Sequence, residues 1–168
     1  VLGYFLVTEL LLPQLQAAGK ARVVNVASQL AGGLDLADVQ FERRAWSGRA
    51  AYAQSKQADR MLTWALARRL SGTGVTANAM HPGFVATEIF GKGGGLISLG
   101  ASLYSKLRGR RPEEGADTVV WLAASKSARG HSGRFWFDRA PRSPHLLAWT
   151  RESSADRAVH LGAVGRRN

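Results

Sequence analysis

Three stretches of the chain carry apolar residues at helical spacing. Residues 4–18 repeat Leu and Phe side chains over successive turns, although Pro13 should bend or locally break this helix. A longer helix is predicted from about 48 to 71, and Ser47 can cap its first turn. Residues 111–125 place a proline and two glutamates ahead of a third apolar stripe, which is typical of a helix N-terminus.

Short apolar runs between these helices predict strands. The sequence "RVVNVAS" at 22–28 is rich in β-branched residues, and "VTANAMHP" at 75–82 ends in a proline that closes the strand. "GRFWFD" at 133–138 predicts a third strand. The glycine- and serine-containing region at 84–111 is long enough to be a lid or to carry short helices of its own. Because strands and helices alternate, we expect an α/β fold whose parallel strands are joined by right-handed crossovers.

Composition and charge narrow the range of partners. The chain has 168 residues and no Cys, which excludes disulfides, thiolate metal sites and cysteine nucleophiles. Its formal net charge of +11 favours nucleic acid or an anionic surface as a partner. The arginines are spread along the chain without a nucleic-acid-binding motif, so we predict no nucleic-acid partner. A basic nucleic-acid or anionic-surface binder is kept as a further alternative.

The apolar runs are too short for a membrane span. None approaches the ~18 residues that a transmembrane helix needs. We therefore expect no transmembrane segment in this part of the protein, and an intracellular, cytoplasmic location. His81 stands at a strand end without a second ligand at a suitable spacing, so no metal site is predicted.

The candidate chemistry lies where the predicted strands end. In parallel sheets, ligands bind beyond the carboxyl ends of the strands. Ser28 ends the first strand and Pro82-Gly83 follows the second, while the helix between them carries Tyr52 and Lys56. Residues i and i+4 share a helix face, so we expect the phenol and the ammonium to project together into one crevice with Ser28.

A phenol, an ammonium and a hydroxyl are suited to proton transfer. A cation beside a phenol favours its phenolate form, and a serine hydroxyl can hold a reacting oxygen in place. The set therefore fits proton exchange with a carbonyl or alcohol oxygen. None of the three groups can deliver a hydride, so that chemistry must come from a cofactor. A Tyr and a Lys four residues apart also arise by chance in about one such chain in ten, so the prediction depends on the order of the surrounding motifs.

Three motifs in order resemble the short-chain dehydrogenase/reductase family. "RVVNVAS", "YAQSK" and "VTANAMHPGFVAT" are similar to the second half of its members, and the long gap between Ser28 and Tyr52 is similar to its retinol-dehydrogenase-like branch. The resemblance covers residues 1–138. It implies that residues 1–150 are the C-terminal part of one NAD(P)-binding domain with a Rossmann-like, doubly wound parallel sheet, here of about three strands with flanking helices. Residues 151–168 would be a basic, flexible tail.

The resemblance implies a role for each matching residue. Tyr52 would be the catalytic acid and base, Lys56 would assist it and hold the nicotinamide ribose, and Ser28 would orient the substrate oxygen. The implied reaction interconverts an alcohol and a carbonyl on a small, apolar molecule, with NAD(P) as cofactor and NADP favoured over NAD. Cofactor contacts are implied for Tyr52, Lys56, Pro82, Gly83, Val85 and Thr87.

The family's glycine-rich dinucleotide fingerprint is absent from these residues. "GKGGG" at 91–95 lacks the Ser or Thr that a phosphate-gripping loop needs. The chain also starts at Val1 rather than Met, so we expect a piece of a longer protein that is inactive alone. Its strand at 22–28 should expose an edge meant for a missing partner. Whether the full-length protein is a homo-oligomer is left open. The alternative to an enzyme is a non-catalytic remnant of the family that acts as an interaction module.

Overall fold

The computed structural model describes residues 1–85 and 109–143. The predicted helices are α1, α2 and α4, and the predicted strands are β1, β2 and β3. A short 3-10 helix, η2, and a two-residue strand, β4, were not predicted. In chain order the bounds are α1 Leu2–Ala17, β1 Ala21–Val26, α2 Gly48–Arg69, β2 Val75–Met80, α4 Pro112–Ala124, η2 Lys126–Ala128, β3 Phe135–Phe137 and β4 Ala140–Pro141.

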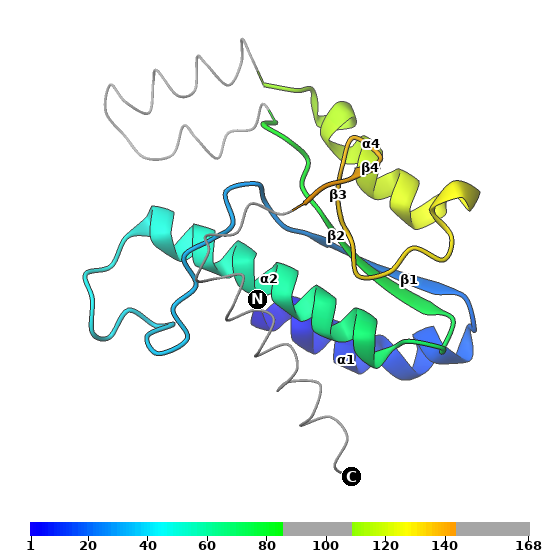
Figure 1. Cartoon of the computed structure of the whole chain (residues 1–168), viewed down its shortest axis with the longest axis horizontal. Coiled ribbons are helices and arrows are strands. Elements are labelled where there is room, and N and C mark those ends of the chain that lie inside the picture. Colours follow the sequence, from blue (N-terminus) through cyan, green and yellow to red (C-terminus); the bar gives the residue numbers. More distant parts are fainter. Residues whose placement is uncertain (86–108, 144–168) are drawn as a thin grey trace.

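The strands form one sheet in the order β1-β2-β3-β4. The first three strands are parallel, with a register that runs from Ala21 opposite Val75 to Val26 opposite Met80, and β4 is antiparallel to β3. Helices α1 and α2 cover one face of the sheet and α4 covers the other (Figure 1). This confirms the α/β fold with a mostly parallel sheet. Among the described residues β1 is hydrogen-bonded to a strand on one side only, as expected for an open edge.

Strand β2 is the centre of the core. Its residues Ala77, Ala79 and Met80 are fully buried, because helices cover both faces of this strand. The small alanines let the flanking helices approach the sheet closely. On one side Leu66 and Leu70 pack against Ala77, and on the other Leu122 and Trp136 pack against Met80.

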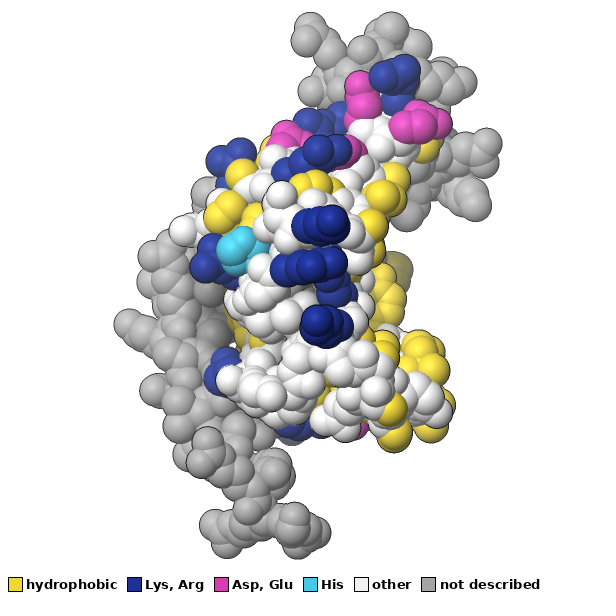
Figure 2. All heavy atoms as spheres, turned by 90° about the vertical axis from the view of Figure 1, so that its right-hand side faces the viewer, with side chains coloured by type: hydrophobic (Ala, Val, Ile, Leu, Met, Phe, Trp, Pro, Cys, Tyr) yellow, Lys and Arg dark blue, Asp and Glu magenta, His cyan; other side chains and the backbone are white. Residues whose placement is uncertain are grey.

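Helix α1 leaves most of its apolar side chains exposed. Leu2 is 78% exposed and Leu10 is 65% exposed, and none of the residues of this helix is buried. Hydrophobic side chains gather at the lower right of the face in Figure 2, at the level of α1 in Figure 1. The helix continues through Pro13, so the local break that the sequence analysis allowed for does not occur. A single proline removes one backbone N–H donor, and the neighbouring turns keep their own hydrogen bonds.

Several predictions from the sequence fall on residues outside the described part. They concern most of the segment at 84–111, the "GKGGG" run, Thr87 and the tail at 151–168. In the part of the chain that is described, no helix combines the length and the apolar character needed to cross a bilayer.

Two buried glutamines of α2 differ in whether their side-chain amides have hydrogen-bond partners. Gln54 donates to the carbonyl oxygen of Val39 at 2.8 Å and accepts from the guanidinium of Arg44 at 2.5 Å. Gln57 is 0% exposed, and neither its amide nitrogen nor its amide oxygen has a partner within residues 1–85 and 109–143. Burial of an unpaired amide costs free energy, which an apolar side chain of similar shape avoids.

Replacing Gln57 with Met should therefore raise the free energy of unfolding by about 1 kcal/mol. The measurement is urea denaturation followed by circular dichroism. Gln54→Met is the matched control on the same helix. It should lower the free energy of unfolding because Arg44 and the carbonyl oxygen of Val39 each lose a hydrogen bond. Equal destabilisation by both substitutions would contradict the assignment of Gln57 as unpaired.

Candidate active site

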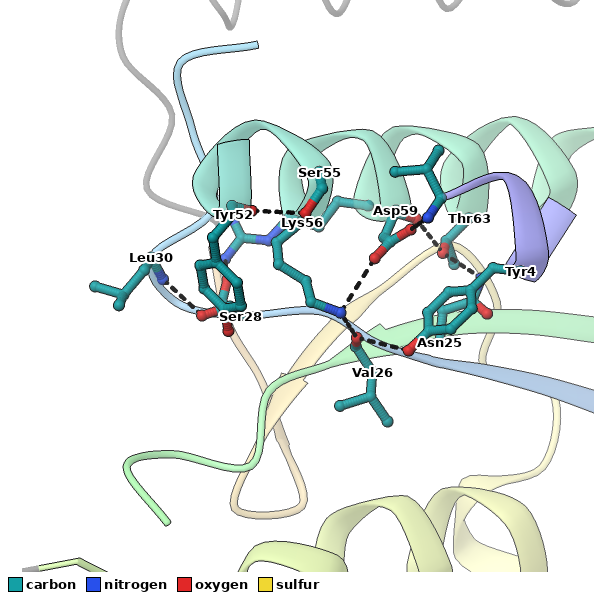
Figure 3. Close-up of polar contacts among 12 residues, drawn as sticks. Tyr4, Asn25, Val26, Ser28, Leu30, Tyr52, Ser55, Lys56, Asp59 and Thr63 are labelled. Carbon is teal, nitrogen blue, oxygen red and sulfur yellow. Dashed lines mark hydrogen bonds and ion pairs between the residues drawn. The ribbon is translucent and has the colours of Figure 1, made fainter. Parts of the chain in front are cut away.

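Helix α2 carries Tyr52 and Lys56 on one face. Ser47 caps the helix, and its side chain accepts a hydrogen bond from the backbone N–H of Ala50 at 3.4 Å. The cap fixes where the helix begins, and the spacing of four residues then aligns the two side chains. Figure 3 shows both projecting from α2 toward the end of β1, where Ser28 lies. The side chain of Tyr52 is 42% exposed and so is accessible from solvent.

The ammonium of Lys56 is held at the end of β1. Its Nζ donates to the carbonyl oxygen of Val26 at 2.9 Å and lies 3.3 Å from Oδ2 of Asp59. The ring of Tyr4 lies under it, with 5.3 Å between Nζ and the ring centroid. An ammonium has three N–H donors, and the described residues engage two of them, which leaves one for a further acceptor.

Asp59 belongs to this site although the sequence analysis did not single it out. Its side chain is 3% exposed and forms an ion pair with Lys56 one helical turn earlier. The spacing of three residues between a lysine and an aspartate is a recognisable signal of such a pair. The burial of the carboxylate was not predictable, because it depends on the packing of α2 against the sheet.

Ser28 lies two residues beyond the end of β1 and is 8% exposed. Its Oγ accepts a hydrogen bond from the backbone N–H of Leu30 at 3.1 Å, and its carbonyl oxygen accepts one from the guanidinium of Arg60. These contacts fix the turn that follows the strand. Because Oγ acts as an acceptor toward Leu30, its own hydrogen is free to bond a substrate oxygen.

The residues after β2 form a turn at the carboxyl end of the neighbouring strand. Gly83 has a φ of 80°, which an L side chain rarely adopts, and a Cβ there would lie 3.1 Å from both Arg110 Cδ and Phe137 Cε2. Its backbone N–H donates to Nδ1 of His81 at 3.2 Å. Val85 forms an isolated parallel bridge with Arg110. Pro82 and Gly83 therefore occupy a rigid turn at the carboxyl end of the sheet.

The structure therefore brings Ser28, Tyr52 and Lys56 to one edge of the sheet, with Pro82, Gly83 and Val85 following the neighbouring strand. A phenol, a held ammonium and a hydroxyl can exchange a proton with an alcohol or carbonyl oxygen. The remaining N–H of Lys56 fits a nicotinamide nucleotide, whose ribose needs a donor, whereas the side of Gly83 on which a Cβ would stand is occupied by Arg110 and Phe137. Within the described residues there is no group of three or more His, Asp or Glu that could hold a metal ion.

The chain is similar in sequence to known dehydrogenases. The family model described as short chain dehydrogenase matches residues 1–93. Human (Homo sapiens) retinol dehydrogenase 13 is 36% identical over 152 residues, which cover 85% of this chain and 45% of that protein. Polyprenol dehydrogenase from Mus musculus is 40% identical over 151 residues, with the same shares. The chain thus spans about half the length of the curated relatives that it matches.

Solved structures share the fold. The crystal structure of an uncharacterized protein from Mycobacterium Paratuberculosis superposes with a TM-score of 0.63 at 26% identity, covering 96% of this chain and 54% of that one. Ligand-free aldohexose dehydrogenase from Thermoplasma acidophilum gives a TM-score of 0.60 at 21% identity, covering 84% and 57%. At 21% identity, the match to aldohexose dehydrogenase supports a shared fold only.

Proposed function

Because the chain belongs to the short-chain dehydrogenase family, we propose that it supplies the catalytic part of an NAD(P)-dependent oxidoreductase that interconverts an alcohol and a carbonyl. The observation that carries this proposal is the convergence of Tyr52, Lys56 and Ser28 at the carboxyl end of the parallel sheet. Tyr52 and Lys56 come from α2 and Ser28 comes from the turn after β1, and each offers a group that the reaction requires. The activity belongs to the whole protein, of which this chain spans about half the length seen in its relatives.

In the proposed reaction Ser28 and Tyr52 act on the substrate oxygen, and Lys56 acts on Tyr52. Ser28 donates its hydroxyl hydrogen to that oxygen and fixes its position. Tyr52 gives the oxygen a proton during reduction and takes it back during oxidation. Lys56 stabilises the phenolate that remains after the transfer, and its attachment to Val26 and Asp59 keeps the ammonium in place. The nicotinamide, when bound, supplies the hydride chemistry.

The cofactor and substrate classes follow from the same proposal. Lys56 offers its third N–H to the ribose hydroxyls, and Pro82 and Gly83 would line the nicotinamide. Val85 and Thr87 would complete the cofactor contacts, and NADP is favoured over NAD. The curated relatives are named for retinol and polyprenol, which supports an apolar alcohol as the substrate.

An activity assay tests this function. The chain is joined to an upstream half that carries the family's glycine-rich fingerprint, and oxidation of NADPH and NADH is followed against a panel of apolar aldehydes and ketones. We expect turnover, with kcat/KM for apolar carbonyls above that for polar ones of equal size. Absence of turnover from a folded, NADPH-binding protein would favour a non-catalytic interaction module instead.

A further inference from the structure

A cavity lies near the carboxyl ends of β2 and β3, where Arg60 of α2 also lines it. It has a volume of about 220 Å³, and its lining includes Arg60, His81, Phe135, Phe137 and Arg142. An adjoining cavity of about 420 Å³ shares Phe135 and Arg142 with it and adds the side chain of Trp64. Both cavities are lined by arginine and aromatic side chains, with Arg60 in the smaller cavity, Arg134 in the larger one and Arg142 in both.

Arg60 is the buried charge of this cavity and is only partly paired. Its side chain is fully buried, with 1% of the residue exposed. One terminal nitrogen donates to the carbonyl oxygen of Ser28, while Nε and Nη1 have no partner among the described residues. Burial lowers the pKa of Arg60 to about 10, which still leaves the guanidinium charged at neutral pH. These two nitrogens carry three N–H groups, and a buried cation whose N–H groups lack partners among the described residues favours binding of an anion.

The walls of the cavity determine which anion would fit. The guanidinium carbon of Arg60 lies 4.0 Å from the ring centroid of Phe135, and that of Arg142 lies 5.8 Å from the centroid of Phe137. His81 stacks on Phe137 with 4.2 Å between the ring centroids. None of the described residues that line the cavity is acidic.

Asp138 acts electrostatically on His81, but it does not neutralise the arginines of the cavity. Asp138 is held by two hydrogen bonds to the guanidinium of Arg110, at 2.5 and 2.8 Å. Within residues 1–85 and 109–143, no acidic side chain pairs with Arg60 or Arg142, so their positive charge is available to a ligand. The rings of Phe135 and Phe137, which Arg60, His81 and Arg110 flank, make the lining apolar beside these cations, which suits an apolar group that carries a negative charge at one end.

We propose that this cavity is a binding site for a small organic carboxylate with an aromatic body. The carboxylate would accept hydrogen bonds from Nε and Nη1 of Arg60, and Arg142 would add a second positive charge. The aromatic body would pack against the parts of Phe135 and Phe137 that line the cavity, toward Trp64. The carbonyl oxygen of Ser28 joins this site to the candidate active site, because Arg60 donates to it.

Isothermal titration calorimetry with benzoate tests the proposal, and benzamide serves as the uncharged probe of the same shape. We expect benzoate to bind the wild-type chain, and benzamide to bind at least about tenfold more weakly. Arg60→Met should lower benzoate affinity by at least tenfold, whereas Arg129→Met, which removes an exposed arginine elsewhere, should leave it unchanged. Equal binding of the two probes, or equal effects of the two substitutions, would overturn the proposal.

Melting temperatures measured with and without benzoate separate an effect on ligand binding from an effect on folding. Arg60→Met should melt at a higher temperature than the wild type without ligand, because it removes a buried and incompletely paired charge. It should also lose the increase in melting temperature that benzoate gives the wild type. If Arg60→Met does not fold, Arg142→Met replaces it and should weaken benzoate several-fold relative to Arg129→Met. Tight binding of inorganic phosphate without binding of benzoate would contradict the proposed ligand class.

Discussion

Replacing Tyr52 with Phe should lower turnover of the enzyme that contains this chain by about 10²- to 10⁴-fold, the usual contribution of general acid–base catalysis. The change removes one oxygen atom and leaves the ring in place. Because the side chain is 42% exposed, its packing should stay intact and stability should change by less than about 0.5 kcal/mol. The measurement is kcat with saturating NADPH and carbonyl, alongside the melting temperature of both proteins.

Tyr4→Phe is the matched control for this substitution. Tyr4 also lies at the site, where its hydroxyl donates to the carbonyl oxygen of Val26 at 3.5 Å and its ring lies beside Lys56. Removing its hydroxyl deletes one long hydrogen bond but no proton donor of the reaction. We expect a change in kcat of threefold at most, on the order of the ~0.5 kcal/mol that such a bond contributes. Retained activity in Tyr52→Phe, or an equal loss of kcat in the two variants, would contradict the role assigned to Tyr52.

The part of this site that local rules govern could be predicted from the sequence. The apolar pattern located α2, and the spacing of four residues then put Tyr52 and Lys56 on one face. The β-branched run located β1 and therefore the position of Ser28 near the end of the strand. Since parallel strands end at a common edge, their convergence followed from topology rather than from any measured distance.

Contacts between distant residues were beyond the reach of the same rules. Arg60 appears in the sequence as one more polar residue of a basic helix, yet it is buried and contacts a carbonyl oxygen 32 positions earlier. Asp59 likewise lies against the sheet rather than in solvent. Helical spacing gives the direction of a side chain on its own helix, but it does not say which strand or turn the side chain meets. Strand β4 was missed because two residues carry no periodicity.

His81 shows how such tertiary contacts create a pH dependence. The residue is 5% exposed, and its Nδ1 accepts the backbone N–H of Gly83. Burial lowers the pKa of His81 from 6.5 to about 4, and the positive charges of Arg60, Arg110 and Arg142 add to this effect, while Asp138 opposes it. Protonation would place a charge among three arginines and remove the acceptor that holds the turn at Gly83.

Stability should therefore fall by about 2 kcal/mol between pH 7.5 and pH 5 through this residue alone. The pKa of His81 is depressed in the folded state, so in this window the unfolded chain binds the proton more readily and acid favours unfolding. The contribution is fully present above pH 6.5 and is lost as the pH falls toward 4. Urea denaturation at constant ionic strength measures it as a difference between the wild type and His81→Asn. Carboxylates titrate in both proteins and largely cancel, so parallel stability curves for the two chains would rule out His81 as the source.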